Sequence, residues 1–286
     1  MQNARFILGE SPVWQESESS WYCVDIVGGT IHKQDTHNNI TTQRNSVYVS
    51  NIVCSQRGFL VSQENRVFHT CKNFKHDNVL CTIDQPTSMR TNDGSVGPDG
   101  KYWFGTMEKH PSGLNGKIYS VDAKGTLLVQ GEDIGIPNSF IWLDSTNLLI
   151  TDSYLQKTFK IELLENGTLD WKNRKVWLDL SATKGTPDGG ALDEDGNVWL
   201  AIWGAAVVNQ YSNEAVLLKS IKLKALQPTS CAFGGENMDE LFITTATEGM
   251  SSRQLKAFPD SGTTIRQVVD VKGSVLLAFK TDEIIC

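Results

Sequence analysis

The segment RTNDGSVGPDGKYWFGTM, residues 90–107, contains the pattern from which the fold can be predicted. It contains a polar turn, SVGPDG, followed at once by an aromatic run, KYWFGTM, as expected of a strand entered from a tight turn. Further runs of this kind, most of them also after a polar turn, are WYCVDI from Trp21, GFLVSQ from Gly58, NLLITDS from Asn147, NVWLAIW from Asn197 and ELFITTA from Glu240. Successive runs lie on the order of 40 to 50 residues apart, the period of a four-stranded propeller blade. We therefore predict an all-β chain that forms a six-bladed β-propeller.

The segments that follow these runs predict the remaining strands of each blade. They carry β-branched or aromatic residues in rough alternation and end at Gly, Asn or Asp turns: TIHKQDT, RVFHTCK, GKIYSVD, QKTFKIEL and VNQYSN. Helical periodicity is nearly absent, apart from a turn expected around residues 251–255. No linker divides the chain, so we predict a single propeller domain over residues 1–286. We expect FILGESPVW to close it by lying beside VVDVKGSVLLAFK.

Composition and charge exclude several classes of function. The chain has 286 residues, 26 Lys plus Arg against 33 Asp plus Glu, and a net charge of −7, which argues against nucleic acid as a partner. The first ten residues contain no apolar segment typical of a signal peptide, and no stretch approaches the length of a membrane span. We expect a cytoplasmic protein without a membrane partner, and its oligomeric state stays open. The six cysteines have irregular spacing, which favours free thiols over a disulfide scaffold.

Three oxygen-bearing residues form the best candidate site. Glu10, Asn138 and Asp188 each sit in a short phrase that reads as a tight turn: LGESPVW, GIPNSFIW and GTPDGGALD. Two carboxylates and an amide oxygen suit a hard cation such as Ca²⁺, Mg²⁺ or Mn²⁺. The three cannot meet on one helix or strand. They can meet where blades surround a central channel, so we predict a divalent cation in that channel.

The same phrases, in this order, resemble the SMP-30/gluconolactonase/regucalcin-like family. LGESPVW with WYCVDI, then RTNDGSVGPDGKYWFGTM, then IPNSFIW with TDS, then TPDGGALDEDGNVWLA carry the resemblance, which runs from about Phe6 to the VKGS segment. It implies a six-bladed propeller with one divalent cation near its axis, which could be Ca²⁺, Zn²⁺, Mn²⁺ or Mg²⁺. It also implies hydrolysis of sugar-acid lactones, with a small-molecule lactone as the partner.

The resemblance also implies roles for individual residues. Glu10, Asn138 and Asp188 become metal ligands, with Asp188 also the catalytic base for the attacking water. Arg90 and Asn92 match the family's substrate-contacting pair. Guanidinium and amide groups suit the carboxylate and hydroxyl oxygens of a polyhydroxylated acid.

Several neighbouring positions have no settled role at this point. His110 follows GTM near the expected channel mouth and is a candidate substrate contact, whereas Ser139 stands where the family often has glycine. Asp93 reads as a turn residue. Asp152 and Ser153 could approach the channel or cap the end of a strand.

The predicted reaction is hydrolysis of a lactone, with the cation polarising the carbonyl and Asp188 taking a proton from water. Two alternatives stay open: a phosphotriesterase or aryl esterase that uses the same site, and a non-catalytic calcium-binding regulatory propeller. The pair Arg90 and Asn92 favours an enzyme, because a structural ion needs no polar clamp for a substrate.

Overall fold

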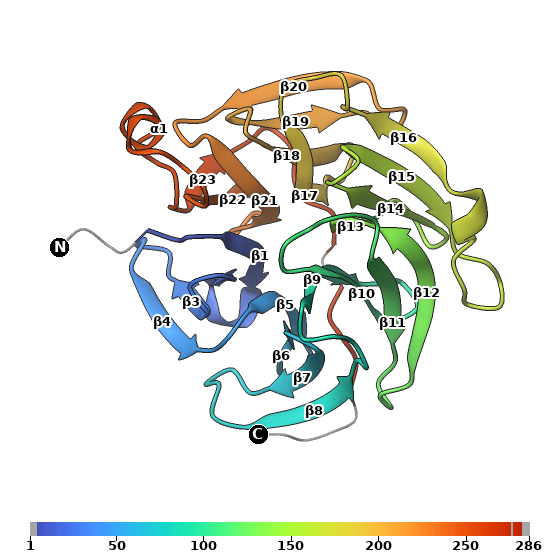
Figure 1. Ribbon diagram of the computed structural model, residues 1–286. Coiled ribbons are helices and arrows are strands. Elements are labelled where there is room, and N and C mark those ends of the chain that lie inside the picture. The colour runs from blue at the N-terminus through green and yellow to red at the C-terminus, as the bar shows by residue number, and fades with distance from the viewer. Residues whose placement is uncertain (1–4, 276, 282–286) are drawn as a thin grey trace. The chain divides into compact units, whose positions relative to one another are not determined.

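The computed structural model describes residues 5–275 and 277–281, together with all their side chains except those of Arg44 and Asn45. The chain forms two compact units: residues 1–49 with 183–274 make the first unit, and residues 50–182 with 275–286 make the second. In the described residues each unit holds three antiparallel sheets, so the chain contains the six strand repeats predicted from its sequence (Figure 1). The prediction of a single domain over residues 1–286 stays a prediction.

The first unit contains two four-stranded sheets and one of three strands, each with its strands in sequence order. Their strands are β1 (Gly9–Gln15), β2 (Ser20–Asp25), β3 (Thr30–Gln34) and β4 (Ile40–Asn45); β17 (Thr186–Leu192), β18 (Val198–Trp203), β19 (Val207–Tyr211) and β20 (Leu217–Lys222); and β21 (Gln227–Gly234), β22 (Glu240–Ala246) and β23 (Ile265–Val268). A 3-10 helix, η1 (Glu16–Glu18), joins β1 to β2. The helix α1 (Ser252–Ala257) begins at a capping box formed by Ser251 and Gln254, which confirms the turn predicted there.

The second unit contains three four-stranded sheets, again with the strands of each in sequence order. Their strands are β5 (Val49–Ser55), β6 (Gly58–Gln63), β7 (Arg66–Thr70) and β8 (Asp77–Thr82); β9 (Met89–Val96), β10 (Tyr102–Glu108), β11 (Gly116–Val121) and β12 (Leu127–Ile134); and β13 (Pro137–Trp142), β14 (Asn147–Asp152), β15 (Lys157–Glu162) and β16 (Lys175–Asp179). A 3-10 helix, η2 (Trp171–Asn173), lies between β15 and β16.

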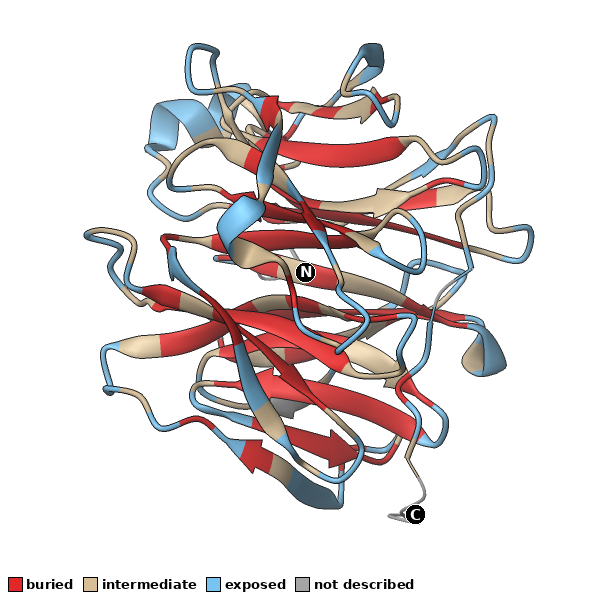
Figure 2. Ribbon diagram, turned by 90° about the vertical axis from the view of Figure 1, so that its right-hand side faces the viewer, coloured by how far each residue is buried: buried red, intermediate tan, exposed pale blue. Residues whose placement is uncertain are grey.

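Each apolar run of the sequence forms the second strand of its sheet, and each alternating segment forms the third. The second strands are almost wholly buried, as in Trp103 and Trp199, whose side chains have no exposed surface. Figure 2 shows the buried residues concentrated in strands, while the exposed residues lie mainly in loops and helices. We call the strands that precede the apolar runs the first strands: β1, β5, β9, β13, β17 and β21.

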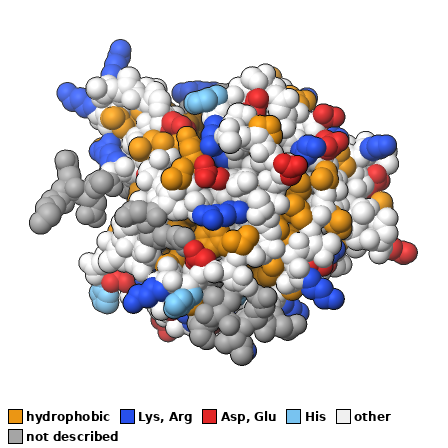
Figure 3. Space-filling model, turned by 60° about the horizontal axis from the view of Figure 1, so that its bottom comes forward, with side chains coloured by type: hydrophobic (Ala, Val, Ile, Leu, Met, Phe, Trp, Pro, Cys, Tyr) orange, Lys and Arg blue, Asp and Glu red, His pale blue; other side chains and the backbone are white. Residues whose placement is uncertain are grey.

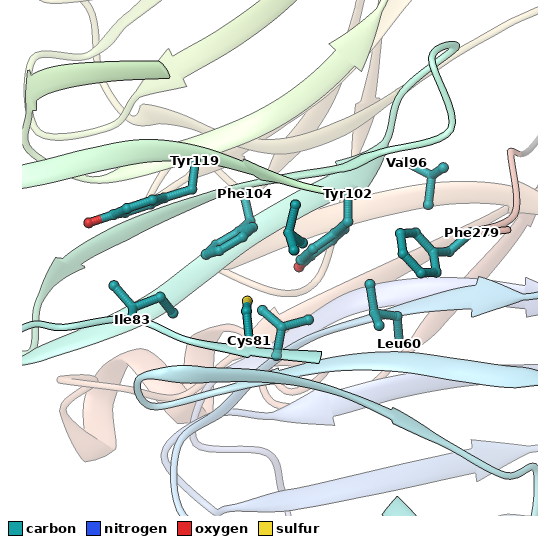
Figure 4. Packing of buried hydrophobic residues seen from close by; sticks show 10 residues of the cluster. Leu60, Cys81, Ile83, Val96, Tyr102, Phe104, Tyr119 and Phe279 are labelled. Carbon is teal, nitrogen blue, oxygen red and sulfur yellow. The ribbon is translucent and has the colours of Figure 1, made fainter. Parts of the chain in front are cut away.

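The core consists of side chains that neighbouring sheets of one unit share. In the second unit, Leu60 of β6, Tyr102 and Phe104 of β10, and Phe279 belong to one cluster (Figure 4). In the first unit, Trp199 packs edge-on against Phe233 of β21 at 5.8 Å between ring centroids. Burial of these large side chains holds adjacent sheets together, at about 25 cal/mol for each Å² of apolar surface removed from water.

The expected closure of the chain needs correction. In its described residues, the segment beginning at Val268 does not pair with the N-terminal strand: β1 pairs with β2, and Leu8 bridges Ala246. Residues Gly273 and Phe279 instead bridge Asp193 and Ser55. The short strand β23 takes the third place in the last sheet, so the later segment is not needed there.

The cysteines follow the prediction in part. Cys23, Cys81 and Cys231 are buried free thiols, and Cys54 is a half-buried one. Burial raises the pKa of the Cys231 thiol to about 12, which keeps it protonated and unreactive. Cys71 is disulfide-bonded, so the prediction of a free thiol is wrong there, and Cys286 lies outside the described residues.

Charged and hydrophobic side chains are mixed on the face of the molecule that Figure 3 shows, where basic and acidic groups are interspersed. Such mixing agrees with the modest net charge of −7. In the part of the chain that the structure describes, no helix is both long enough and apolar enough to cross a membrane.

Candidate cation and substrate site

The predicted site residues lie at irregularities in the first strands. In β9, Thr91 pairs with Thr106 and Gly94 with Phe104, so Asn92 and Asp93 together face Gly105 alone. The same two-against-one pairing occurs in β1, β13 and β17, at residues 11–12, 139–140 and 188–189. An extra residue of this kind is a β-bulge, which bends the strand and redirects the side chains beside it.

The three predicted ligands stand at or directly before these bulges. Glu10 and Asn138 are the last paired residues before theirs, and Asp188 is the first residue inside its own. They therefore lie within strands, and the prediction of tight turns is wrong. Pro137 and Pro187 fit because a first strand is the edge of its sheet, where a missing backbone N–H breaks no ladder bond. Asn138 and Asp188 are buried, and Glu10 is half-buried.

The backbone after two of the ligands is left-handed. Ser11 and Ser139 have φ angles of 49° and 51°, a region that strains any residue other than glycine. Position 139 is thus one where a glycine would fit without strain. The serine that stands there needs support from its surroundings.

In the second unit the structure brings Arg90, Asn92 and Asn138 together. Arg90 Nη1 donates to Asn92 Oδ1 at 2.6 Å and to the Thr91 carbonyl at 2.9 Å. Asn92 Nδ2 donates to Asn138 Oδ1 at 2.7 Å and to the carbonyl of Pro137 at 2.9 Å. All three side chains are buried. The predicted substrate pair therefore forms a hydrogen-bonded chain that ends on the oxygen of a predicted ligand.

The amide of Asn138 is oriented by two contacts. Its Nδ2 donates to Ser153 Oγ at 2.9 Å, while its Oδ1 accepts from Asn92. Together these contacts fix which end of the amide is the acceptor. A carbonyl-type oxygen with a second lone pair suits a hard cation, so Asn138 fits the role predicted for it.

In the first unit, β21 supports the other two ligands. The Thr229 hydroxyl donates to the carbonyl of Gly9, next to Glu10, at 2.5 Å. On the other side, a side chain at position 189 would collide with Ser230, so Gly189 allows β17 to approach β21 beside Asp188. One strand thus sets the backbone beside both carboxylates.

The oxygen ligands Glu10 and Asp188 belong to the first unit and Asn138 to the second. Their convergence on one cation stays a prediction. Among the described residues there is no group of three or more His, Cys, Asp and Glu that could hold a metal ion. The predicted set contains two carboxylates and an amide, a combination outside that residue class, and its all-oxygen chemistry still suits a hard cation.

Asp93 is not the turn residue that the sequence indicated. It lies inside β9, where Oδ1 accepts from Asn51 Nδ2 at 2.9 Å and from the Gly94 N–H at 2.8 Å. Its Oδ2 accepts from the Ser139 N–H at 2.8 Å. Burial raises the pKa of the Asp93 carboxyl to about 6, although its hydrogen bonds lower it.

Other acidic residues have structural roles. The Asp152 carboxylate accepts from the N–H groups of Gly135, Ile136 and Tyr154 at 3.0–3.1 Å, so it caps the end of its strand, one of the two readings left open. Asp193 accepts from Asn197 N–H at 2.7 Å and from Trp199 Nε1 at 2.9 Å, so it holds the turn between β17 and β18. His110 is exposed in the connection between β10 and β11, and its substrate role stays a prediction.

Sequence reasoning missed two further polar residues in first strands. Asn51 lies in β5 and Thr229 in β21, and both are buried. A signal for Thr229 was present, because Gln227-Pro228-Thr229 repeats the pattern of Ile136-Pro137-Asn138. Each of the six first strands thus carries a buried or half-buried polar side chain: Glu10, Asn51, Asn92, Asn138, Asp188 and Thr229.

These sheets and their bulged first strands define a class of protein, the six-bladed β-propeller. The fold matches the solved structure of a calcium-binding protein, regucalcin, from Agrobacterium tumefaciens with a TM-score of 0.90, covering 96% of this chain and 95% of that one at 24% identity. The predicted fold class is thereby confirmed.

The chain belongs to the SMP-30/gluconolactonase/LRE-like family, whose model matches residues 8–247. It is 30% identical to the regucalcin of Gallus gallus over 272 residues, covering 90% of this chain and 89% of that protein. It is also 26% identical to the putative sugar lactone lactonase YvrE of Bacillus subtilis over 287 residues, covering 98% and 97%. The resemblance predicted from the sequence motifs is confirmed.

Proposed function

We propose that the protein hydrolyses sugar-acid lactones with the help of one divalent cation. The observation that carries this proposal is the buried chain from Arg90 through Asn92 to Asn138. It couples a cationic group suited to an acid substrate with an oxygen suited to a cation. Membership of a family that includes a putative sugar lactone lactonase supports the same reaction class.

Glu10, Asn138 and Asp188 would hold the cation. When bound, a divalent cation polarises a carbonyl group and lowers the pKa of water. Asp188 serves as the base that accepts a proton from the attacking water. Its place inside a bulge, braced by Gly189 against β21, limits the positions its carboxylate can take. No covalent intermediate with the protein is required.

Arg90 and Asn92 orient the substrate in different ways. Both hydrogens of the Asn92 amide are used within the protein, so Asn92 can contribute only acceptor capacity, through the second lone pair of Oδ1, to a substrate hydroxyl. Arg90 supplies the positive charge. We assign His110, on the exposed connection after β10, to discrimination among lactones.

A pH-indicator assay tests the proposal on protein stripped of metal. Aldonolactones are offered with Ca²⁺, Mg²⁺, Mn²⁺ or Zn²⁺ added back singly, and we expect no hydrolysis without metal and recovery with at least one of them. Full activity in a verified metal-free sample contradicts the cation's role. Hydrolysis of aryl esters or phosphotriesters alone supports the esterase alternative, and cation binding without any hydrolysis supports a regulatory propeller.

The variant His110→Ala tests the assignment of His110 to discrimination among lactones. We expect altered preference among aldonolactones, with cation affinity unchanged, because the residue is exposed on a connection outside the bulged strands. Comparison of kcat/KM for two lactones of different ring size measures it. Loss of cation binding in this variant shows that the residue is misplaced.

A further inference from the structure

The carboxylate of Asp93 joins three sheets of the second unit. It belongs to β9, accepts from Asn51 of β5, and accepts from the backbone N–H of Ser139 in β13. With the N–H groups of Gly94 and Phe140, these contacts give four donors to two carboxylate oxygens. Because both oxygens face donors of the protein, Asp93 is suited to hold the backbone in place and poorly suited to ligate a cation.

The contact with Ser139 controls the peptide group that follows Asn138. That N–H belongs to the peptide bond between the two residues, and the φ angle of Ser139 is 51°. A non-glycine residue keeps such a conformation only where its surroundings impose it. The hydrogen bond of 2.8 Å to Asp93 Oδ2 is charge-assisted and therefore stronger than a neutral one.

Asp93 is itself oriented by a series of buried hydrogen bonds. Asn51 Nδ2 donates to Asp93 Oδ1, and Asn51 Oδ1 accepts from the Tyr102 hydroxyl at 3.0 Å. Tyr102 is in turn bonded to Ser62 Oγ at 2.8 Å. Burial raises the pKa of the Tyr102 hydroxyl above its usual value, so this group stays a donor at neutral pH.

We propose that Asp93 is a positioning residue that holds the Asn138–Ser139 bulge, and through it sets the affinity of the site for its cation. The inference rests on the proposed function, because that function assigns Asn138 as a ligand. Groups that orient a ligand without touching the metal change metal affinity by about 10- to 100-fold when they are replaced. The series through Asn51 and Tyr102 extends this support along the chain. Asn51 lies 42 residues before Asp93, and Tyr102 lies 51 residues after Asn51.

Asp93→Asn tests the proposal with little change of shape. The asparagine amide has only one oxygen, and its NH₂ group must face either the Ser139 N–H or the Asn51 Nδ2. Since two donors cannot bond each other, one of these two contacts is lost in either orientation. Calorimetric titration of metal-stripped protein with the activating cation measures the effect, and we expect a Kd about tenfold higher. At cation concentrations above the new Kd, kcat should recover to within about threefold, because Asp188 and Arg90 are untouched.

Two further variants sharpen the test. Asp122→Asn is the matched control, since Asp122 accepts the N–H groups of Lys124 and Thr126 in an exposed hairpin turn, and we expect no change in Kd. Adding Ser139→Gly to Asp93→Asn should recover part of the affinity, because glycine adopts a positive φ without support. If Asp93→Asn fails to fold, Asn51→Ala leaves the carboxylate in place, and we expect a two- to fivefold rise in Kd.

The outcomes separate this inference from the proposed function. Failure of the unaltered protein to bind any cation overturns both. If Asn138→Ala loses cation affinity while Asp93→Asn and Asn51→Ala keep it within twofold, the proposed function stands and the positioning role is overturned. A higher Kd in Asp93→Asn with partial recovery by Ser139→Gly supports the role.

Discussion

The first strand and the fourth strand of a sheet differ in almost every respect. In β9, most residues are buried, the ladder is broken by a bulge, and charged or amide side chains lie inside. In β20, five of six residues are exposed and the strand holds no residue of the proposed site. Both strands are edges of their sheets, but first strands pack closely against one another, as β9 does against β13 and β1 against β21.

This difference teaches where backbone irregularity can be tolerated. A bulge in a first strand is covered by its neighbours, so its polar groups find partners such as Asp93 and Thr229. The outer edge instead relies on water to satisfy its backbone, and it needs only a solvent-compatible surface. Substitutions in first strands should therefore cost activity or stability, whereas those at exposed positions of a fourth strand such as β20 should cost little.

The largest effect is expected at Asp188. Asp188→Ala should lower kcat on an aldonolactone by at least about 10²-fold, the usual scale for losing a main catalytic group. Steady-state kinetics with saturating cation measure this loss, and Glu10→Ala should show a loss of similar size. Unchanged turnover with metal content preserved removes the altered residue from the site.

The Arg90 and Asn92 pair comes next. Replacing both with alanine should cost roughly 2 kcal/mol or more of transition-state stabilisation on an aldonolactone, because polar groups of the substrate lose their partners. A hydroxyl-free aryl ester should lose much less, which the ratio of kcat/KM values reports. Equal losses on both substrates indicate that the pair supports the architecture, as its bond to Asn138 allows.

Ser139 tests the strained backbone directly. Ser139→Val should lower the free energy of unfolding by roughly 2 kcal/mol, because a β-branched residue is poorly tolerated at a φ of 51°. Ser139→Gly is the control. Relief of strain and the greater entropy of the unfolded chain nearly cancel, so its stability should stay within about 0.5 kcal/mol. Denaturant unfolding of both variants decides the matter, and equal stability argues against strain at this position.

Asn138→Ala should weaken stabilisation by the cation. A tenfold higher Kd removes about 1.4 kcal/mol of stabilisation when the cation concentration greatly exceeds both Kd values. In a protein of this size the melting temperature gained on adding cation should then fall by about 2–4 °C. Thermal unfolding over a series of cation concentrations measures this effect. The curve of melting temperature against cation concentration for the variant should run parallel to that of the unaltered protein and lie below it. A shift identical to that of the unaltered protein excludes Asn138 as a ligand.

The smallest effect is expected on the outer edge. Leu217 of β20 is 53% exposed, and Leu217→Thr should change the free energy of unfolding by less than about 0.5 kcal/mol with kcat unaltered. Denaturant unfolding measures the change in stability, and steady-state kinetics measure kcat. A large loss of activity here erases the proposed contrast between first and fourth strands.

Much of the architecture could be predicted because its signals are local. The runs beginning at Trp21 and Lys101 form second strands since a buried strand needs a short apolar sequence between turns, and this is visible within about ten residues. The first strands were harder to recognise. Proline and glycine in GESP and TPDGG indicate turns in isolation, whereas in the fold they mark bulges at a sheet edge.

The number of repeats, the residue types of the candidate site and the family of the chain could all be predicted from the amino-acid sequence. How Asn138 is held became visible only in the folded chain. Asp93 meets Asn51 and Ser139 across 42 and 46 residues of chain, and no local pattern specifies such a meeting. The physical reason is that a hydrogen bond depends on where two backbones lie in space, and that is set by the packing of sheets rather than by the sequence around either partner.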